Sequence, residues 1–271
     1  MLKCGNSPIG VCSWSLQTDV PAVADALRQM NIEHIHLAVG AGTDPATGGE
    51  YLDAIKKQDW IVTSTMIDFP QEDYSSLDAI KVTGGVVQDD CWEANRQRFC
   101  RAVDITAELG VEYLSMHAGF IDESDPEYAK KISSRITQLA DAAADKSITL
   151  LLETGQETAE GLKAFLEEAN HPAIAVNFDP ANMILYDKGN PVQAVSVLAP
   201  WIKHVHIKDA IRTTEPGTWG QEVPWGSGQV NTAEFLKALQ EINYAGALAI
   251  EREAGDTRFD DIKLASELLN A

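Results

Sequence analysis

Short apolar runs alternate with longer amphipathic segments along the chain. This alternation is typical of repeated βα units, in which each strand of a parallel sheet is followed by a helix. Eight strands are enough to close such a sheet into a barrel. We therefore predict an α/β fold, a (β/α)8 TIM barrel, with residues 1–271 forming a single domain. The runs that we expect to form strands are residues 10–15, 34–39, 61–67, 113–117, 149–153, 174–178, 204–207 and 248–251.

The segments between these runs carry helix start and stop signals. Asp19 precedes Pro21 and an amphipathic run to Met30, which indicates an N-terminal cap followed by proline in the first turn. Residues 92–109 predict a longer helix that stops at Gly110. The other expected helices are residues 126–146, 158–169, 192–198, 232–242 and 259–269.

Two connections are longer than simple turns. Residues 69–90 follow the third predicted strand, and residues 209–231 follow the seventh. Long connections in compact domains are usually functional, and in a barrel the loops after the strands lie on the active-site face. We expect both to cover a substrate.

Composition narrows the possible partners. The formal net charge is −20, and an acidic surface repels phosphate backbones and anionic lipid, so we expect neither a nucleic acid nor a membrane partner. No apolar stretch approaches the length that spans a bilayer, and the N-terminus lacks the apolar region of a signal peptide. We expect a cytoplasmic protein with free thiols, and leave open whether it forms a homo-oligomer.

Four predicted strands end in residues that can bind a metal: Glu153, Asp179, His206 and Glu251. Ionised carboxylates would cost free energy inside a packed barrel, but at its mouth they can converge on a cation that offsets their repulsion. Three carboxylates and one imidazole suit a divalent ion, and oxygen-rich ligation favours the harder ions. We expect one Mn²⁺, with Mg²⁺, Co²⁺ or Zn²⁺ as alternatives.

Each of the four residues also has a purely structural interpretation. Glu153 can cap a helix or face solvent, and Asp179 before proline can form a turn. His206 can be a hydrogen-bonded core residue, and Glu251 can pair with Arg252. Because the four fall at four consecutive strand ends, we favour the metal site.

Strand alternation identifies further candidates around this site. Residues two apart on a strand share a face, so His204 lies deeper in the barrel on the side of His206. We expect Trp14 and His117, near the ends of the first and fourth strands, to line the substrate pocket. Asn182 either binds the substrate or caps a local turn.

Several motifs resemble the xylose isomerase-like TIM barrel superfamily. They are Glu153 and residues 177–182 (NFDPAN), 204–209 (HVHIKD), 226–228 (GSG) and 246–251 (GALAIE). The resemblance covers most of the chain and is closest to the sugar isomerase and epimerase branch, with its D-tagatose 3-epimerase-like and inosose dehydratase-like enzymes.

The resemblance implies roles for individual residues. Glu153, Asp179, His206 and Glu251 are implied to be the metal ligands, with the two glutamates on opposite sides of the substrate as catalytic residues. Arg212 resembles an arginine that contacts substrate in ketose 3-epimerases. The chain departs from the epimerase pattern at Asn182, where those enzymes carry a histidine.

The expected reaction is proton abstraction next to a carbonyl of a small sugar or polyol, through a metal-stabilised enediolate. Return of the proton to the opposite face is epimerisation, and return to the neighbouring carbon is isomerisation. Loss of a β-hydroxyl makes the enzyme a dehydratase, that is a lyase, on a keto-inositol or keto-sugar. The ligands do not distinguish these outcomes, nor whether the substrate is phosphorylated.

Two other functions fit the same fold. An endonuclease IV-like phosphodiesterase needs three metal ions and additional histidines, one of which is replaced here by Asn182. A non-catalytic protein that binds metal and sugar would use the same pocket.

Overall fold

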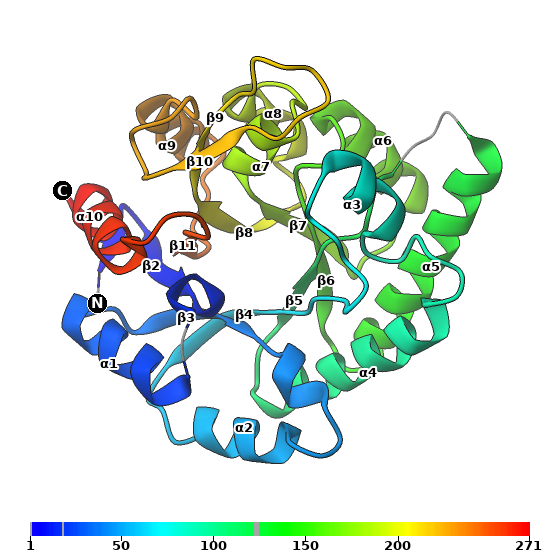
Figure 1. The fold of residues 1–271 in the computed structure, drawn as a ribbon, viewed down its shortest axis with the longest axis horizontal. Coiled ribbons are helices and arrows are strands. Elements are labelled where there is room, and N and C mark those ends of the chain that lie inside the picture. Colours follow the sequence, from blue (N-terminus) through cyan, green and yellow to red (C-terminus); the bar gives the residue numbers. More distant parts are fainter. Residues whose placement is uncertain (1, 18, 122–124) are drawn as a thin grey trace.

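A computed structural model describes residues 2–17, 19–121 and 125–271. The described residues form a closed barrel of eight parallel strands with helices around it (Figure 1). The predicted (β/α)8 barrel is confirmed. Closure comes from β2, which pairs in parallel with both β3 and β11. The barrel strands are β2 (Ser7–Cys12), β3 (His34–Ala38), β4 (Ile61–Met66), β5 (Tyr113–Met116), β6 (Thr149–Glu153), β7 (Ile174–Phe178), β8 (Ile202–Ile207) and β11 (Leu248–Ile250).

The helices lie outside the strands, and several begin where the sequence predicts. The Asp19 side chain accepts a hydrogen bond from Ala22 N at 2.9 Å and so caps the first helix. In the described part of the chain, no helix is long and apolar enough to cross a bilayer. The helices are α1 (Val20–Met30), α2 (Gly48–Ile55), α3 (Leu77–Thr83), α4 (Trp92–Glu108), α5 (Pro126–Ala144), α6 (Ala159–Ala169), α7 (Pro180–Leu185), α8 (Pro191–Leu198), α9 (Thr232–Glu241) and α10 (Arg258–Asn270).

The structure differs from the predicted elements at several places, and it adds α2 and α7, which were not among the expected helices. The first barrel strand ends at Cys12 and is followed by the 3-10 helix η1 (Ser13–Leu16), so Trp14 lies in a turn beyond the strand. The connection of residues 69–90 contains α3, which is capped by the Ser76 side chain. The connection of residues 209–231 contains the hairpin of β9 (Asp209–Ile211) and β10 (Gln221–Val223).

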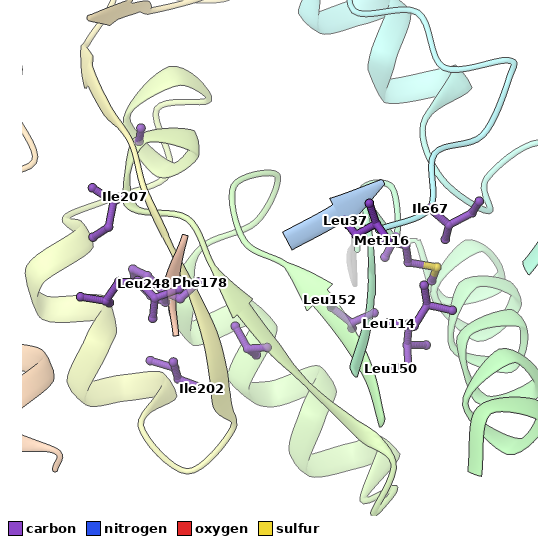
Figure 2. Close-up of a cluster of buried hydrophobic side chains, with 14 of the residues drawn as sticks. Leu37, Ile67, Leu114, Met116, Leu150, Leu152, Phe178, Ile202, Ile207 and Leu248 are labelled. Atoms are coloured by element: carbon purple, nitrogen blue, oxygen red, sulfur yellow. The ribbon is translucent and has the colours of Figure 1, made fainter. Parts of the chain in front are cut away.

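Alternation along the strands separates an apolar outer layer from a polar interior. Figure 2 shows part of the outer layer, with Leu114, Leu150 and Leu152 on neighbouring strands. These side chains are fully or almost fully buried, and each contributes about 1.5–3 kcal/mol through the hydrophobic effect. The outer layer therefore holds the helices to the barrel.

The barrel interior carries hydrogen-bonded polar side chains. His204 Nδ1 lies 3.0 Å from Asn177 Oδ1, and its Nε2 lies 3.0 Å from Thr63 Oγ1. Ser64 and Ser115 share a hydrogen bond of 3.0 Å. Buried polar groups are costly unless they are hydrogen-bonded, and these contacts satisfy that requirement. The interior is thus a polar network that leads to the mouth of the barrel.

The strand register aligns the carboxyl ends of the last four barrel strands. Glu153 pairs with Asn177 of β7, and His206 of β8 pairs with Ala249 of β11. Glu251 N continues this ladder with a 3.0 Å hydrogen bond to Ile207 O. The residues at these strand ends therefore meet on one face of the barrel.

Candidate metal centre and active site

The structure brings together the four residues predicted from the strand ends. Glu153, Asp179, His206 and Glu251 are all buried, and each places a ligand atom within 4.8 Å of those of the other three. His206 Nδ1 lies 3.4 Å from Glu153 Oε1, 3.4 Å from Asp179 Oδ2 and 3.2 Å from Glu251 Oε2. Their donor set is three carboxylates and one imidazole.

Three atoms in this cluster are buried without a hydrogen-bond partner: Asp179 Oδ2, His206 Nδ1 and Glu251 Oε2. An unpartnered buried polar atom is rare because it costs about 1–3 kcal/mol. Lys208 Nζ lies 2.9 Å from Glu251 Oε2 as an ion pair, but not in hydrogen-bond geometry. A cation held between the three atoms would satisfy all of them, so the residues fit a metal.

Asp179 has two roles, because one carboxylate oxygen caps a helix and the other faces the cluster. Its Oδ1 accepts hydrogen bonds from Ala181 N at 2.8 Å and Asn182 N at 2.9 Å, and so caps α7. Pro180 occupies the first turn of that helix, where its missing N–H is not needed. The cap fixes the carboxylate with Oδ2 directed at the cluster.

Neutral donors hold the two glutamates. Asn182 Nδ2 donates to Glu153 Oε1 at 2.9 Å, and Asn177 Nδ2 donates to Glu153 Oε2 at 3.2 Å. Trp14 Nε1 donates to Glu251 Oε1 at 2.6 Å. The structure thus places Trp14 and Asn182 against the predicted ligands, whereas the substrate contacts proposed for them are still predictions.

His36, on β3, fixes the orientation of His206. His36 Nδ1 lies 3.0 Å from His206 Nε2, and His36 Nε2 lies 3.2 Å from Thr65 O. A carbonyl only accepts, so His36 Nε2 carries the proton. Burial lowers the pKa of His36 to about 3, so its Nδ1 is bare and accepts from His206 Nε2–H. His206 therefore faces the three carboxylates with Nδ1, the nitrogen that gives up its proton when it serves as a ligand.

The pKa values show how the cluster tolerates its charge. Burial opposes protonation of His206, but Cys12 and the carboxylates of Glu251 and Glu153 outweigh it, and its pKa lies well above the usual range. Burial opposes ionisation of Glu251, but Lys208 and His206 hold its pKa well below the usual range. Two cationic side chains, His206 and Lys208, therefore offset part of the carboxylate charge of the cluster.

Lys208 is a site residue that the sequence analysis did not select. Only 4% of its side chain is exposed, and its Nζ lies 2.7 Å from Glu253 Oε2 and 3.8 Å from Asp179 Oδ2. Lys208 directly follows β8 and continues the face of His204 and His206, so strand alternation predicts its direction. No comparable pattern indicated His36, which reaches His206 across the barrel.

A cavity of about 620 Å³ opens beside the cluster. It includes Trp14, His117 and Asn182, three of the four residues predicted to bind substrate. His117 Nε2 lies 3.9 Å from Glu153 Oε1. Burial opposes protonation of His117, but the carboxylates of Glu153 and Glu72 outweigh it and raise its pKa.

Arg212 lies elsewhere in the structure. Its guanidinium pairs with Asp187 and donates to Gly189 O at 2.8 Å. Among the residues that the structure describes, it is not part of the cavity lining. Its predicted contact with substrate is untested, and in this conformation its donors are directed to protein acceptors.

A family model described as xylose isomerase-like TIM barrel matches residues 50–271. The chain belongs to this family. The resemblance inferred from the motifs is therefore confirmed. The crystal structure of a xylose isomerase domain protein from Planctomyces limnophilus is similar throughout, with a TM-score of 0.85 and 29% identity over 97% of this chain and 95% of that one.

Curated relatives of this chain are named for different reactions. A ketose 3-epimerase from Arthrobacter globiformis is 26% identical over 172 residues, which are 59% of this chain and 55% of that protein. An inosose dehydratase from Clostridium botulinum is 26% identical over 141 residues, 45% of this chain and 46% of that protein. This chain thus spans about half the length of these relatives, which include both a sugar epimerase and a dehydratase.

Proposed function

We propose that this protein is a metal-dependent isomerase or epimerase that moves a proton next to a carbonyl of a small sugar or polyol. The observation that carries the proposal is the set of three unpartnered ligand atoms around one point at the mouth of the barrel. The similarity to epimerases and dehydratases supports an enzyme rather than a passive binder.

The four ligands would hold one divalent cation, Mn²⁺ by preference, which supplies polarisation of the carbonyl and the adjacent hydroxyl when bound. Glu153 ends β6 and Glu251 follows β11, and β7 and β8 separate these strands in the barrel. The two carboxylates therefore approach the substrate from different sides. One removes the proton from carbon, and the other returns a proton to the opposite face or the neighbouring carbon.

The remaining predicted residues have complementary tasks. Trp14 donates to Glu251, which fixes that carboxylate and presents the indole to the cavity. Asn182 fixes Glu153 in the same way from the start of α7. His117, whose Nε2 lies 3.9 Å from the same Glu153 oxygen, can donate a hydrogen bond to a substrate hydroxyl.

A dehydratase is the second candidate because a relative with that activity matches nearly half of the chain. Dehydration begins with the same proton abstraction and differs in the next step, when a β-hydroxyl leaves. A single experiment therefore tests both. Incubation with Mn²⁺ and a panel of ketoses, inososes and 3-keto-glycosides in D2O should place solvent deuterium next to a carbonyl, and a dehydratase should also yield a product lighter by one water.

The matched variant is Glu251→Gln, which keeps the shape of the side chain and its contact with Trp14. We expect turnover to fall by at least about 10³-fold, because the substitution removes a group that transfers a proton and also binds the metal. The circular dichroism spectrum should be retained. Wild-type turnover in this variant would remove Glu251 from the mechanism. Absence of deuterium uptake from every compound, together with no binding of divalent ions, would refute the proposed function.

A further inference from the structure

The cavity is larger than a single sugar requires. Its volume is about 620 Å³. A hexose has about twelve non-hydrogen atoms and, at the ~30 Å³ that one water occupies in the liquid, fills at most roughly 360 Å³. Space for a second group therefore continues beyond the carbons that reach the four ligands.

Aromatic side chains form much of the cavity wall. Tyr186 and Trp219 lie edge to face, with ring centroids 4.7 Å apart. The Tyr186 hydroxyl accepts a hydrogen bond from Gln156 Nε2 at 3.3 Å, and its ring packs over Gly155. Because residues 155 and 156 follow Glu153 out of the barrel, this aromatic pair lies on the outer side of the cluster. Tyr74, 44% exposed, contributes a further ring to the same lining.

Trp219 contributes a buried donor with no partner. Its Nε1 makes no hydrogen bond within the described part of the chain, although the atom is shielded from solvent. The segment around it is held in place, since Gly220 N donates to Leu185 O at 3.2 Å. Asp209 fixes the same connection by accepting from Gly226 N and Gly228 N, at 3.0 and 2.9 Å. An indole N–H in an ordered wall is therefore left to bind an acceptor that is not part of the chain.

The charges of the lining indicate what this acceptor can be. Lys208 already forms ion pairs with Glu251 and Glu253, and further acidic side chains line the cavity. Asp68 and Glu222 are paired with Arg98 and Arg252, which are not part of the lining. The cationic groups of the lining, Lys208 and His117, face carboxylates. An anionic substituent such as a phosphate would therefore find no unpaired cation among the described lining residues. The additional acidic side chains are Asp68, Glu72 and Glu222.

We propose that Tyr74, Tyr186 and Trp219 form an outer subsite for an uncharged ring attached to the reacting sugar, with Trp219 Nε1 donating to an oxygen of the substrate. This inference rests on the proposed function, because that function places the reacting carbons of the sugar at the four metal ligands. The ring is either a second sugar or an aromatic group, because both present an apolar face and lie next to a glycosidic oxygen.

Calorimetric titration can test the subsite without turnover. The probes are methyl β-glucoside, phenyl β-glucoside, cellobiose and glucose 6-phosphate, each titrated into the Mn²⁺-loaded protein. We expect the phenyl glucoside or cellobiose to bind at least 10-fold more tightly than the methyl glucoside, and glucose 6-phosphate to bind most weakly. The preferred probe distinguishes an aromatic ring from a second sugar.

Two tryptophan variants supply the control. Trp219→Phe retains a ring but loses the donor, so binding of the preferred ring-bearing probe should weaken by about 3- to 10-fold. Trp201→Phe changes a tryptophan just before β8, at the opposite end of the barrel, and should leave every affinity unchanged. Equal or absent binding of the methyl, phenyl and disaccharide probes, or a Trp219→Phe variant with wild-type affinities, would overturn the subsite. Failure of the proposed reaction would instead appear as a lack of deuterium uptake while these affinities persist.

Discussion

Replacing His36 with leucine removes the acceptor that orients His206. In the wild-type protein both side chains are fully buried, and the pair is linked by one hydrogen bond of 3.0 Å. In His36→Leu, His206 Nε2–H has lost this acceptor, at a cost of about 1–3 kcal/mol. Asn177 Nδ2, which can only donate, lies 3.1 Å from the same nitrogen. The neutral imidazole is then free to adopt the tautomer in which Nε2 accepts from Asn177 and Nδ1, the nitrogen that faces the carboxylates, keeps its proton.

The magnitude follows from this loss of orientation. Removing the partner that orients a ligating histidine typically weakens metal binding by about 10- to 100-fold. We therefore expect the Kd for Mn²⁺ to rise by that factor, and the free energy of unfolding of the metal-free protein to fall by about 1–3 kcal/mol.

Two further variants separate orientation from general destabilisation. His36→Asn keeps an acceptor near the position of Nδ1 and should restore most of the affinity. Ser115→Ala breaks a buried hydrogen bond to Ser64 on another part of the barrel wall, so it should lower stability without changing the Kd. The assay is titration calorimetry with Mn²⁺, with urea unfolding followed by circular dichroism. A His36→Leu protein that binds Mn²⁺ with wild-type affinity would refute this account of His206.

Two other predictions concern stability. Asp179→Asn keeps an oxygen to cap α7, so the variant should fold. Mn²⁺ at 100 times the Kd should stabilise the wild-type protein by about 2.7 kcal/mol, whereas the same concentration should leave the Tm of Asp179→Asn unchanged in thermal scans. An equal shift of Tm in both proteins would contradict this. Burial raises the pKa of Glu157 from 4.5 to about 8, so the folded state keeps a proton that the unfolded chain has released, and stability should decline as the pH rises through this interval. Because the Glu157 side chain is partly exposed, solvent screening limits the effect, and Glu157→Gln should remove roughly 1 kcal/mol of this decline in stability. Urea unfolding at pH 5 and pH 8.5 measures the difference, and an unchanged pH dependence would exclude Glu157 as its source.

The barrel and its cluster could be predicted because both depend on local patterns. The strands of residues 149–153 and 174–178 have the predicted bounds, since each is a short apolar run followed by a polar residue. The carboxyl ends of parallel strands share one face of the barrel, which was enough to bring Glu153 and Asp179 together with His206 and Glu251.

The support of the cluster could not be predicted because it depends on contacts across the barrel. His36 belongs to β3 and His206 to β8, and β2 and β11 lie between these strands in the ring. No sequence spacing encodes such a contact. The side-chain direction of Arg212 is equally non-local, since it depends on Asp187, which lies beyond the C-cap of α7.

The buried ammonium of Lys208 has a consequence for how the protein matures. Domains whose ligands repel one another without their ion, such as small zinc modules, fold only when the ion arrives. Here the chain carries its own counter-charge, 2.9 Å from Glu251, so the mouth of the barrel can assemble first and be loaded afterwards. Under the proposed function, a metal-poor cell would then hold the protein folded and inactive, and supply of the ion would start its activity without new synthesis.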